Sequence, residues 1–155
     1  MTKNEKIFSG IEASSESVIV ALKKYLSAIS APDKLLLFSD NTTANKFYTS
    51  YREFTEKLLH ELDLMDSYAA QLSSLVCSAD QSMETNELSL FSTLLDSYTS
   101  WRVQAYSFVS STDKIFADRD TEFKGTDAVR TAREFLTKTE QLKGKFDDEK
   151  IHTRP

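Results

Sequence analysis

The feature that most constrains this sequence is the stretch 44–124, which contains neither glycine nor proline. These two residues most often end helices and form tight turns. The whole chain of 155 residues has only 3 Gly and 2 Pro, whereas their average combined usage is roughly 12%. Sandwiches, propellers and nucleotide-binding α/β folds need more turns and glycine-rich loops than this. The chain therefore predicts long, uninterrupted helices.

Apolar side chains recur every three or four residues along most of the chain, which is the period of a helix. The strongest pattern spans residues 44–79, with a predicted packing seam at Phe47, Tyr51, Phe54, Leu58, Leu62, Met65, Ala69, Leu72, Val76 and Ala79. Residues 86–124 repeat the pattern, with a seam at Leu88, Phe91, Leu95, Tyr98, Ala105, Val109, Phe116 and Phe123. The polar, acidic residues 78–85 predict the turn of a long antiparallel hairpin.

Three shorter helical segments complete the prediction. The first carries apolar residues from Ile7 to Ile29, and two capping boxes leave its start open between residues 2–5 and 9–12. A short Leu-rich helix is expected within 30–40, and a fifth follows Gly125 with Ala128, Ala132, Phe135, Thr139, Leu142 and Phe146 on one face.

The predicted fold class is all-α, an elongated antiparallel helical bundle built on the long hairpin. The length is enough to bury one core and too short for two domains. We expect residues 1–146 to form this single domain. Residues 147–155 lack apolar periodicity and predict a disordered tail.

Charge and cysteine usage limit the setting. The net charge of −5 argues against a nucleic-acid partner, because such proteins neutralise phosphates. The single cysteine, Cys77, cannot form an internal disulfide, which suits a reducing compartment. The chain begins without the apolar core of a signal peptide, and no apolar run approaches the roughly 18 residues of a spanning helix. We expect a cytoplasmic protein, with peripheral membrane contact left open.

The sequence carries no pattern typical of an active site. It has no Gly-x-Ser-x-Gly nucleophile motif, phosphate loop or dinucleotide fingerprint. Carboxylate metal sites in helical bundles use a Glu three residues before a His, but Lys57 occupies that position before His60. We therefore expect no enzymatic activity, no cofactor and no metal.

The aromatic content of 11% is high for a plain bundle. Most of these rings are expected in the core, but Tyr48, Trp101 and Tyr106 fall off the strict seams. Aromatic side chains outside a core are common anchors of protein interfaces. These three residues are the predicted partner-binding residues of a non-enzymatic helical scaffold or adaptor. Its partner would be a second copy or another helical protein, and an apolar ligand held between helices is a further alternative.

Basic residues are distributed unevenly. No Lys or Arg occurs from Leu58 through Trp101, whereas Lys124, Arg130, Arg133, Lys138, Lys143 and Lys145 follow late in the chain. The long hairpin therefore predicts a molecule with an acidic end and a basic end.

The segments around residues 106–146 resemble the second and third helices of sorting-nexin-type BAR domains. The resemblance rests on Tyr106, Lys114, the Ile115–Phe116 pair, Arg119 and Phe123, and then on the run 127–134. It implies a dimeric, curved helical module that binds membrane in trafficking. Carried over residue by residue, it places Arg119 on the long middle helix and Lys124, Arg130 and Arg133 near a tip. With Lys138, the last three form the alternative, membrane-binding site.

Overall fold

The computed structural model describes residues 3–29, 41–77, 85–117 and 125–152, all of which are helical. The helices are α1 (Lys3–Ile29), α3 (Asn41–Cys77), α4 (Thr85–Ala117) and α5 (Gly125–His152). The all-α prediction is therefore confirmed. The short helix expected within 30–40 and the turn at 78–84 lie outside the described residues, as do Arg119 and Lys124.

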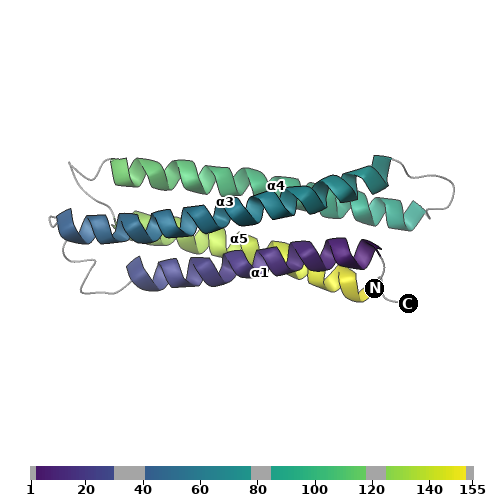
Figure 1. Ribbon diagram of the computed structural model, residues 1–155, viewed down its shortest axis with the longest axis horizontal. Helices are drawn as coiled ribbons and strands as arrows, with labels where there is room; N and C mark the ends of the chain where they lie inside the picture. Colours follow the sequence, from purple (N-terminus) through teal and green to yellow (C-terminus); the bar gives the residue numbers. More distant parts are fainter. Residues whose placement is uncertain (1–2, 30–40, 78–84, 118–124, 153–155) are drawn as a thin grey trace.

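The four helices form an elongated up-down-up-down bundle (Figure 1). α1 packs between α3 and α5, and α4 packs between the same two helices on the opposite side. Each helix thus runs antiparallel to both neighbours, while α1 and α4 lie diagonally across the core. α3 and α4 are the long antiparallel hairpin that the apolar periodicity predicts.

The core follows the predicted seams closely on three helices. α1 buries Ile7, Ile11, Val18, Leu22, Tyr25 and Ile29. α3 buries every predicted position from Phe47 to Leu72, and α5 buries Ala128, Ala132, Phe135, Thr139, Leu142 and Phe146. These positions recur at steps of three, four or seven, so one side of each helix faces the bundle axis along its length.

On α4 the predicted seam is partly wrong. The buried residues are Phe91, Leu94, Tyr98, Trp101, Ala105, Phe108, Thr112 and Phe116. Leu88, Leu95 and Val109 are only partly buried. Leu95 and Val109 are apolar and directly follow the buried residues Leu94 and Phe108. The predicted seam therefore included the wrong member of each pair. Thr112 is polar, yet it is fully buried on this seam.

The structure decides one helix boundary that the sequence left open and corrects another. α1 starts at Lys3, so Gly10 lies within a helix and the capping box at residues 9–12 starts nothing. The role of Gly10 is close packing, because a Cβ there would lie 2.2 Å from Cζ of Tyr68 on α3. At the other end α5 continues to His152, so residues 147–152 are helical and not a disordered tail.

Candidate functional site

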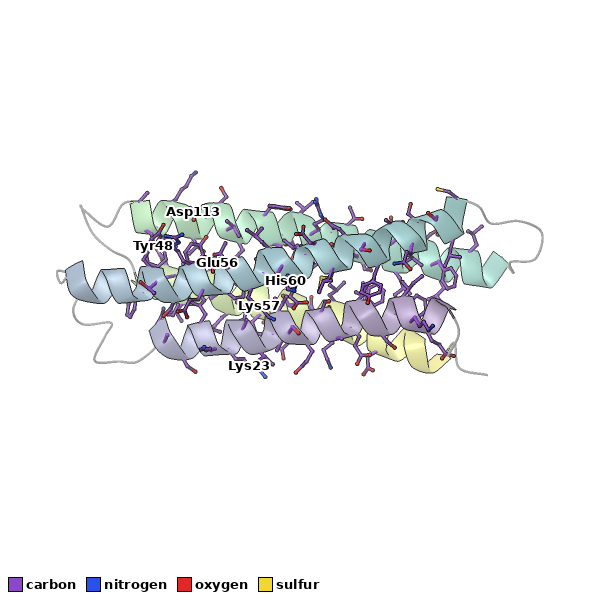
Figure 2. The ribbon with its side chains drawn as sticks, in the orientation of Figure 1. Lys23, Tyr48, Glu56, Lys57, His60 and Asp113 are labelled. Atoms are coloured by element: carbon purple, nitrogen blue, oxygen red, sulfur yellow. The ribbon has the colours of Figure 1, made fainter. Side chains whose placement is uncertain are left out.

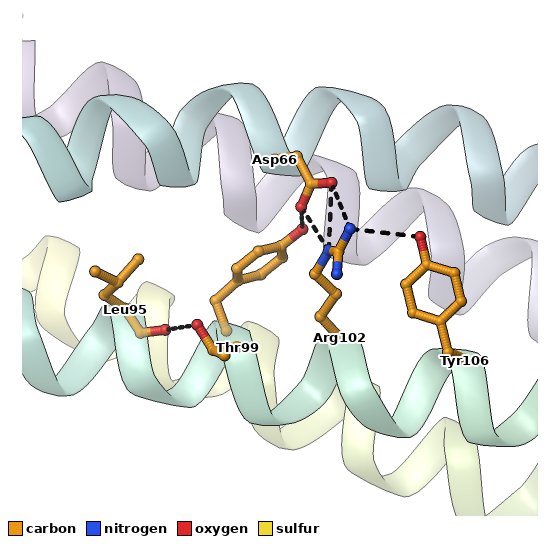
Figure 3. A network of polar contacts seen from close by, with 6 residues as sticks. Asp66, Leu95, Thr99, Arg102 and Tyr106 are labelled. Atoms are coloured by element: carbon orange, nitrogen blue, oxygen red, sulfur yellow. Dashed lines mark hydrogen bonds and ion pairs between the residues drawn. The ribbon is translucent and has the colours of Figure 1, made fainter.

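A network of polar side chains joins α3 to α4 near the middle of the hairpin (Figure 3). Arg102 donates from Nε to Oδ1 of Asp66 at 3.0 Å and from Nη2 to Oδ2 at 3.2 Å. The Tyr98 hydroxyl also donates to Oδ1 of Asp66. Such two-point pairing fixes the guanidinium plane as well as its position. The side chains of Arg102 and Asp66 remain 41% and 39% exposed, so the network lies at the surface.

The helical period of α4 builds the rest of this network. Tyr98, Arg102 and Tyr106 are spaced by four residues, so their side chains follow one another along one side of the helix. The Arg102 guanidinium lies 5.0 Å from the centre of the Tyr106 ring, and Nη2 lies 3.5 Å from its hydroxyl. The Asp66 hydrogen bond raises the pKa of Arg102, while burial and then Asp66 raise the pKa of Tyr98. The tyrosine therefore stays protonated and the arginine charged.

Apolar side chains are exposed beside this network. Val103 is 64% exposed, Leu59 46% and Tyr106 45%. Leu59 precedes Asp66 by two helical turns, and because α3 and α4 are antiparallel it lies at the level of Tyr106. We call Leu59, Asp66, Arg102, Val103 and Tyr106 the α3/α4 face. Among the side chains that the structure describes, five large apolar residues are exposed, and three of them belong to this face.

The three predicted partner-binding residues occupy different environments. Tyr106 is exposed on the α3/α4 face. Tyr48 is half-buried near the start of α3, 5.5 Å from Phe116 between ring centres (Figure 2). Trp101 is only 3% exposed, which corrects its placement off the seam. A step of three from Tyr98 and a step of four to Ala105 place residue 101 on the core side of α4. The predicted seam went from Tyr98 directly to Ala105 and so left Trp101 out.

Trp101 is fixed in the core by polar and aromatic contacts. Its Nε1 donates to Oγ1 of Thr139 on α5 at 2.9 Å. Its ring stacks on Phe135, with 5.8 Å between centres and 17° between planes. Thr139 in turn donates to the Phe135 carbonyl at 2.8 Å. Trp101 thus ties α4 to α5 within the single chain.

Three of the four predicted membrane-binding residues are described by the structure, and they lie in different settings on α5. Arg130 and Arg133 are exposed on α5, and Arg130 pairs with Asp127 at 3.3 Å. Lys138 instead lines a hollow between α4 and α5. Lys143 pairs with Glu16 at the middle of α1, and Lys145 donates to Ser97 in the first half of α4. Both lysines belong to the second half of α5, which runs toward the end of the bundle where α1 begins. The predicted separation of acidic and basic ends is therefore only partial.

Two grooves between helices differ in character. Between α4 and α5, hollows of about 360 and 150 Å³ share Gln104 and Lys138 and are lined mainly by polar side chains. Between α1 and α3, a groove of about 340 Å³ has a mainly apolar lining that includes Val20, Ala21, Ala28 and Phe54. Ligand sites in proteins are concave and mainly apolar, a description that the second groove fits.

Sequence reasoning missed the ion pair between Arg102 and Asp66. Arg102 stands out as the first basic residue after the stretch without Lys or Arg, but this position in the sequence does not identify Asp66 as its partner. Within the described residues, no group of three or more His, Cys, Asp or Glu side chains could hold a metal ion. No described helix is long and apolar enough to cross a membrane.

Three comparisons of this chain with known proteins were negative. Neither a scan against protein-family models nor searches of curated proteins and of solved structures gave a match.

Proposed function

We propose that the protein is a non-enzymatic helical scaffold that acts by protein–protein association, and that it self-associates through the α3/α4 face. The observation that carries this proposal is the exposure of Leu59, Val103 and Tyr106 beside the ordered pair of Asp66 and Arg102. Adjoining exposed apolar residues mark interaction sites more often than scattered ones do. Tyr and Arg are also the side chains most enriched among residues that dominate binding energy.

A second copy suits this face for electrostatic reasons. A two-fold interface apposes the same surface from both subunits, so an uncompensated charge would meet its like. Here the exposed guanidinium is already paired with a carboxylate of the same chain. The network also holds Tyr106 in place before association, which lowers the entropy lost on binding.

Sedimentation velocity across a range of concentrations tests the proposal. The wild type is expected to show a reversible dimer. Val103→Glu combined with Tyr106→Glu should weaken dimerisation by at least about 30-fold, the equivalent of about 2 kcal/mol. Circular dichroism and Tm should stay close to wild type, because both side chains are exposed.

Val20→Glu is the matched control, since Val20 is 58% exposed but lies on α1. It should leave the dimer intact. A wild type that is monomeric at every concentration would contradict self-association, as would equal loss of dimer in the control.

Membrane binding is the second candidate, favoured by the exposure of Arg130 and Arg133 one turn apart on α5. Each basic residue near an anionic surface contributes about 1 kcal/mol. Co-sedimentation with phosphatidylserine vesicles should then fall with rising salt and in the Arg130→Glu, Arg133→Glu double variant. Lys6→Glu with Lys23→Glu makes the same charge change on α1 and should bind as the wild type does. Equal loss in both double variants would reject the site.

A further inference from the structure

The groove between α1 and α3 is an apolar hollow at the surface of the bundle. Its floor includes Tyr25 and Phe54, whose rings stack with 5.7 Å between centres and 8° between planes. Ala21 and Ala28 line it from α1, where short side chains leave room, and Val20 is 58% exposed at its side. The remaining lining residues are Ser17, Lys24, Ser50, Glu53 and Lys57.

The lining decides what kind of molecule suits each groove. The larger hollow between α4 and α5, about 360 Å³, is nearly the same size as the α1/α3 groove of about 340 Å³. Serine, glutamine and lysine side chains in that hollow can hydrogen-bond to water. The lining surface of the α1/α3 groove is mainly apolar, although serine and charged side chains also border it. Displacing poorly bound water with an apolar group favours binding, so an aliphatic chain suits this groove better than a polar molecule does.

The charged residues of the groove indicate the sign of a head group. Lys24 lines it from α1, while Lys57 and Glu53 line it from α3. Lys57 is engaged, because its Nζ lies 3.3 Å from Oε1 of Glu61, a carboxylate whose side chain is only 6% exposed. In Figure 2, Lys57 extends from α3 toward α1, while Lys23 projects from α1 away from α3. Neither Lys24 nor Glu53 forms an ion pair with the described residues. Because two lysines and one glutamate line the groove, its lining carries an excess of positive charge.

The buried hydroxyl of Tyr25 is a second polar group of this lining. Tyr25 is 2% exposed, and its hydroxyl has no hydrogen-bond partner among the described residues. Burial raises the pKa of this hydroxyl, so it remains a hydrogen-bond donor over the ordinary pH range. Buried donors without partners are rare in folded proteins. The oxygen is covered by the bundle, so the hydroxyl marks the floor of the groove and is assigned no part in binding.

We propose that the α1/α3 groove binds a free aliphatic carboxylate of the fatty-acid type. Its chain would pack on Ala21, Ala28 and Phe54, and its carboxylate would pair with Lys24. The site is separate from the α3/α4 face, so it does not depend on self-association.

Equilibrium dialysis with radiolabelled dodecanoate below its critical micelle concentration tests this proposal. Dodecanoate should bind at one site per chain, and dodecanol and dodecyltrimethylammonium should bind more weakly. Shortening the chain should weaken binding by up to about fourfold per methylene, the equivalent of about 0.8 kcal/mol. Equal binding of the cationic analogue, or no binding of dodecanoate at millimolar concentration, would overturn the proposal.

Matched variants locate the site. Lys24→Gln should weaken dodecanoate binding by about fivefold, the scale of an exposed ion pair, whereas Lys23→Gln, outside the groove, should not. Ala28→Leu should fill the groove and reduce binding by more than tenfold, whereas Ala13→Leu, at an exposed position of the same helix, should leave it unchanged. Equal effects within either pair would overturn the assignment. Anionic phospholipid vesicles form the last arm, and binding to vesicles without binding of free dodecanoate would also overturn it.

Discussion

α1 and α4 lie diagonally across the same core but are held by different means. α1 places Ser14 and Ser15 among its larger buried residues, and its backbone approaches α3 and α5 along more of its length than that of α4 does. Gly10 shows this most directly, because the Tyr68 ring occupies the space of a Cβ. α4 instead fills the core with Phe91, Tyr98, Trp101, Phe108 and Phe116.

This difference determines where polar groups enter the bundle. Around α4, side chains form hydrogen bonds between helices, as Tyr51 does to Asp113 at 2.8 Å and Trp101 to Thr139. On α1, buried Ser15 donates to the carbonyl of Ile11 in its own helix at 2.8 Å. Large amphipathic rings bring hydroxyl and N–H groups that need partners when buried, whereas small residues bring helix backbones together without them. The α4 side is therefore the more specific one, and the α1 side the more closely packed.

The largest effect should come from removing the main aromatic anchor of α4. Trp101→Ala is expected to lower the free energy of unfolding by about 3–5 kcal/mol, because it leaves a cavity beside Phe135. Trp101→Phe should cost less, since a ring still fills the site and Thr139 keeps its bond to the Phe135 carbonyl. Urea unfolding measures both. A loss below about 1 kcal/mol in Trp101→Ala would contradict an essential role for this ring on the α4 side.

The close packing at Gly10 of α1 predicts that one substitution changes the free energy of unfolding in opposite directions in two backgrounds. Gly10→Ala should destabilise the protein by about 1 kcal/mol, because overpacking against Tyr68 outweighs the better helix propensity of alanine. In a Tyr68→Ala background the clash is absent, and the same substitution should stabilise by up to about 1 kcal/mol. The double-mutant cycle thus gives a coupling of about 2 kcal/mol. Equal effects in the two backgrounds would show that the Tyr68 ring does not pack closely against Gly10.

Apolar periodicity predicted the four described helices and most of the buried residues of α1, α3 and α5. On α3, Val76 of the predicted seam is only partly buried, and Ala79 lies outside the described residues. On α4 the pattern predicted the wrong residues at two positions. Leu95 and Val109 lie next to buried residues and are apolar too, so periodicity alone could not distinguish the buried row of residues from the adjacent one. The network at Asp66 and Arg102 could not be predicted, because pairing across helices depends on their relative axial position, which one sequence does not specify. The role of Gly10 was missed for the same reason, since it depends on Tyr68 of another helix.

Removing the buried hydroxyl of Thr112 on α4 is expected to raise stability. Thr112 is fully buried, and its hydroxyl has no hydrogen-bond partner among the described residues. Thr112→Val keeps the shape and removes the hydroxyl, so it should raise the free energy of unfolding by about 1 kcal/mol. Thr99→Val is the control, because Thr99 is exposed and its hydroxyl donates to the Leu95 carbonyl. A loss of stability in Thr112→Val would show that this hydroxyl has a partner.

The smallest effect concerns the tyrosine that links α4 to Asp66. At neutral pH, Tyr98→Phe should cost about 1 kcal/mol through its lost hydrogen bond, since Asp66 remains bound to Arg102. The pKa of Tyr98 is raised from the ordinary value of 10.0 by burial and by Asp66. The folded state therefore holds this proton more tightly than the unfolded state does. The resulting stabilisation is complete below pH 10 and is lost as the pH rises above it.

Denaturant midpoints measured between pH 8 and pH 11.5 test this linkage. Stability should fall above pH 10 in the wild type, in which burial also raises the pKa values of Tyr25 and Tyr51. In Tyr98→Phe the fall should be shallower, by up to one proton per molecule unfolded. Tyr106→Phe is the control, since Tyr106 is exposed. Parallel pH profiles for the wild type and Tyr98→Phe would mean that this hydroxyl is not held by the α4 network, and the contrast with α1 would then rest on ring packing alone.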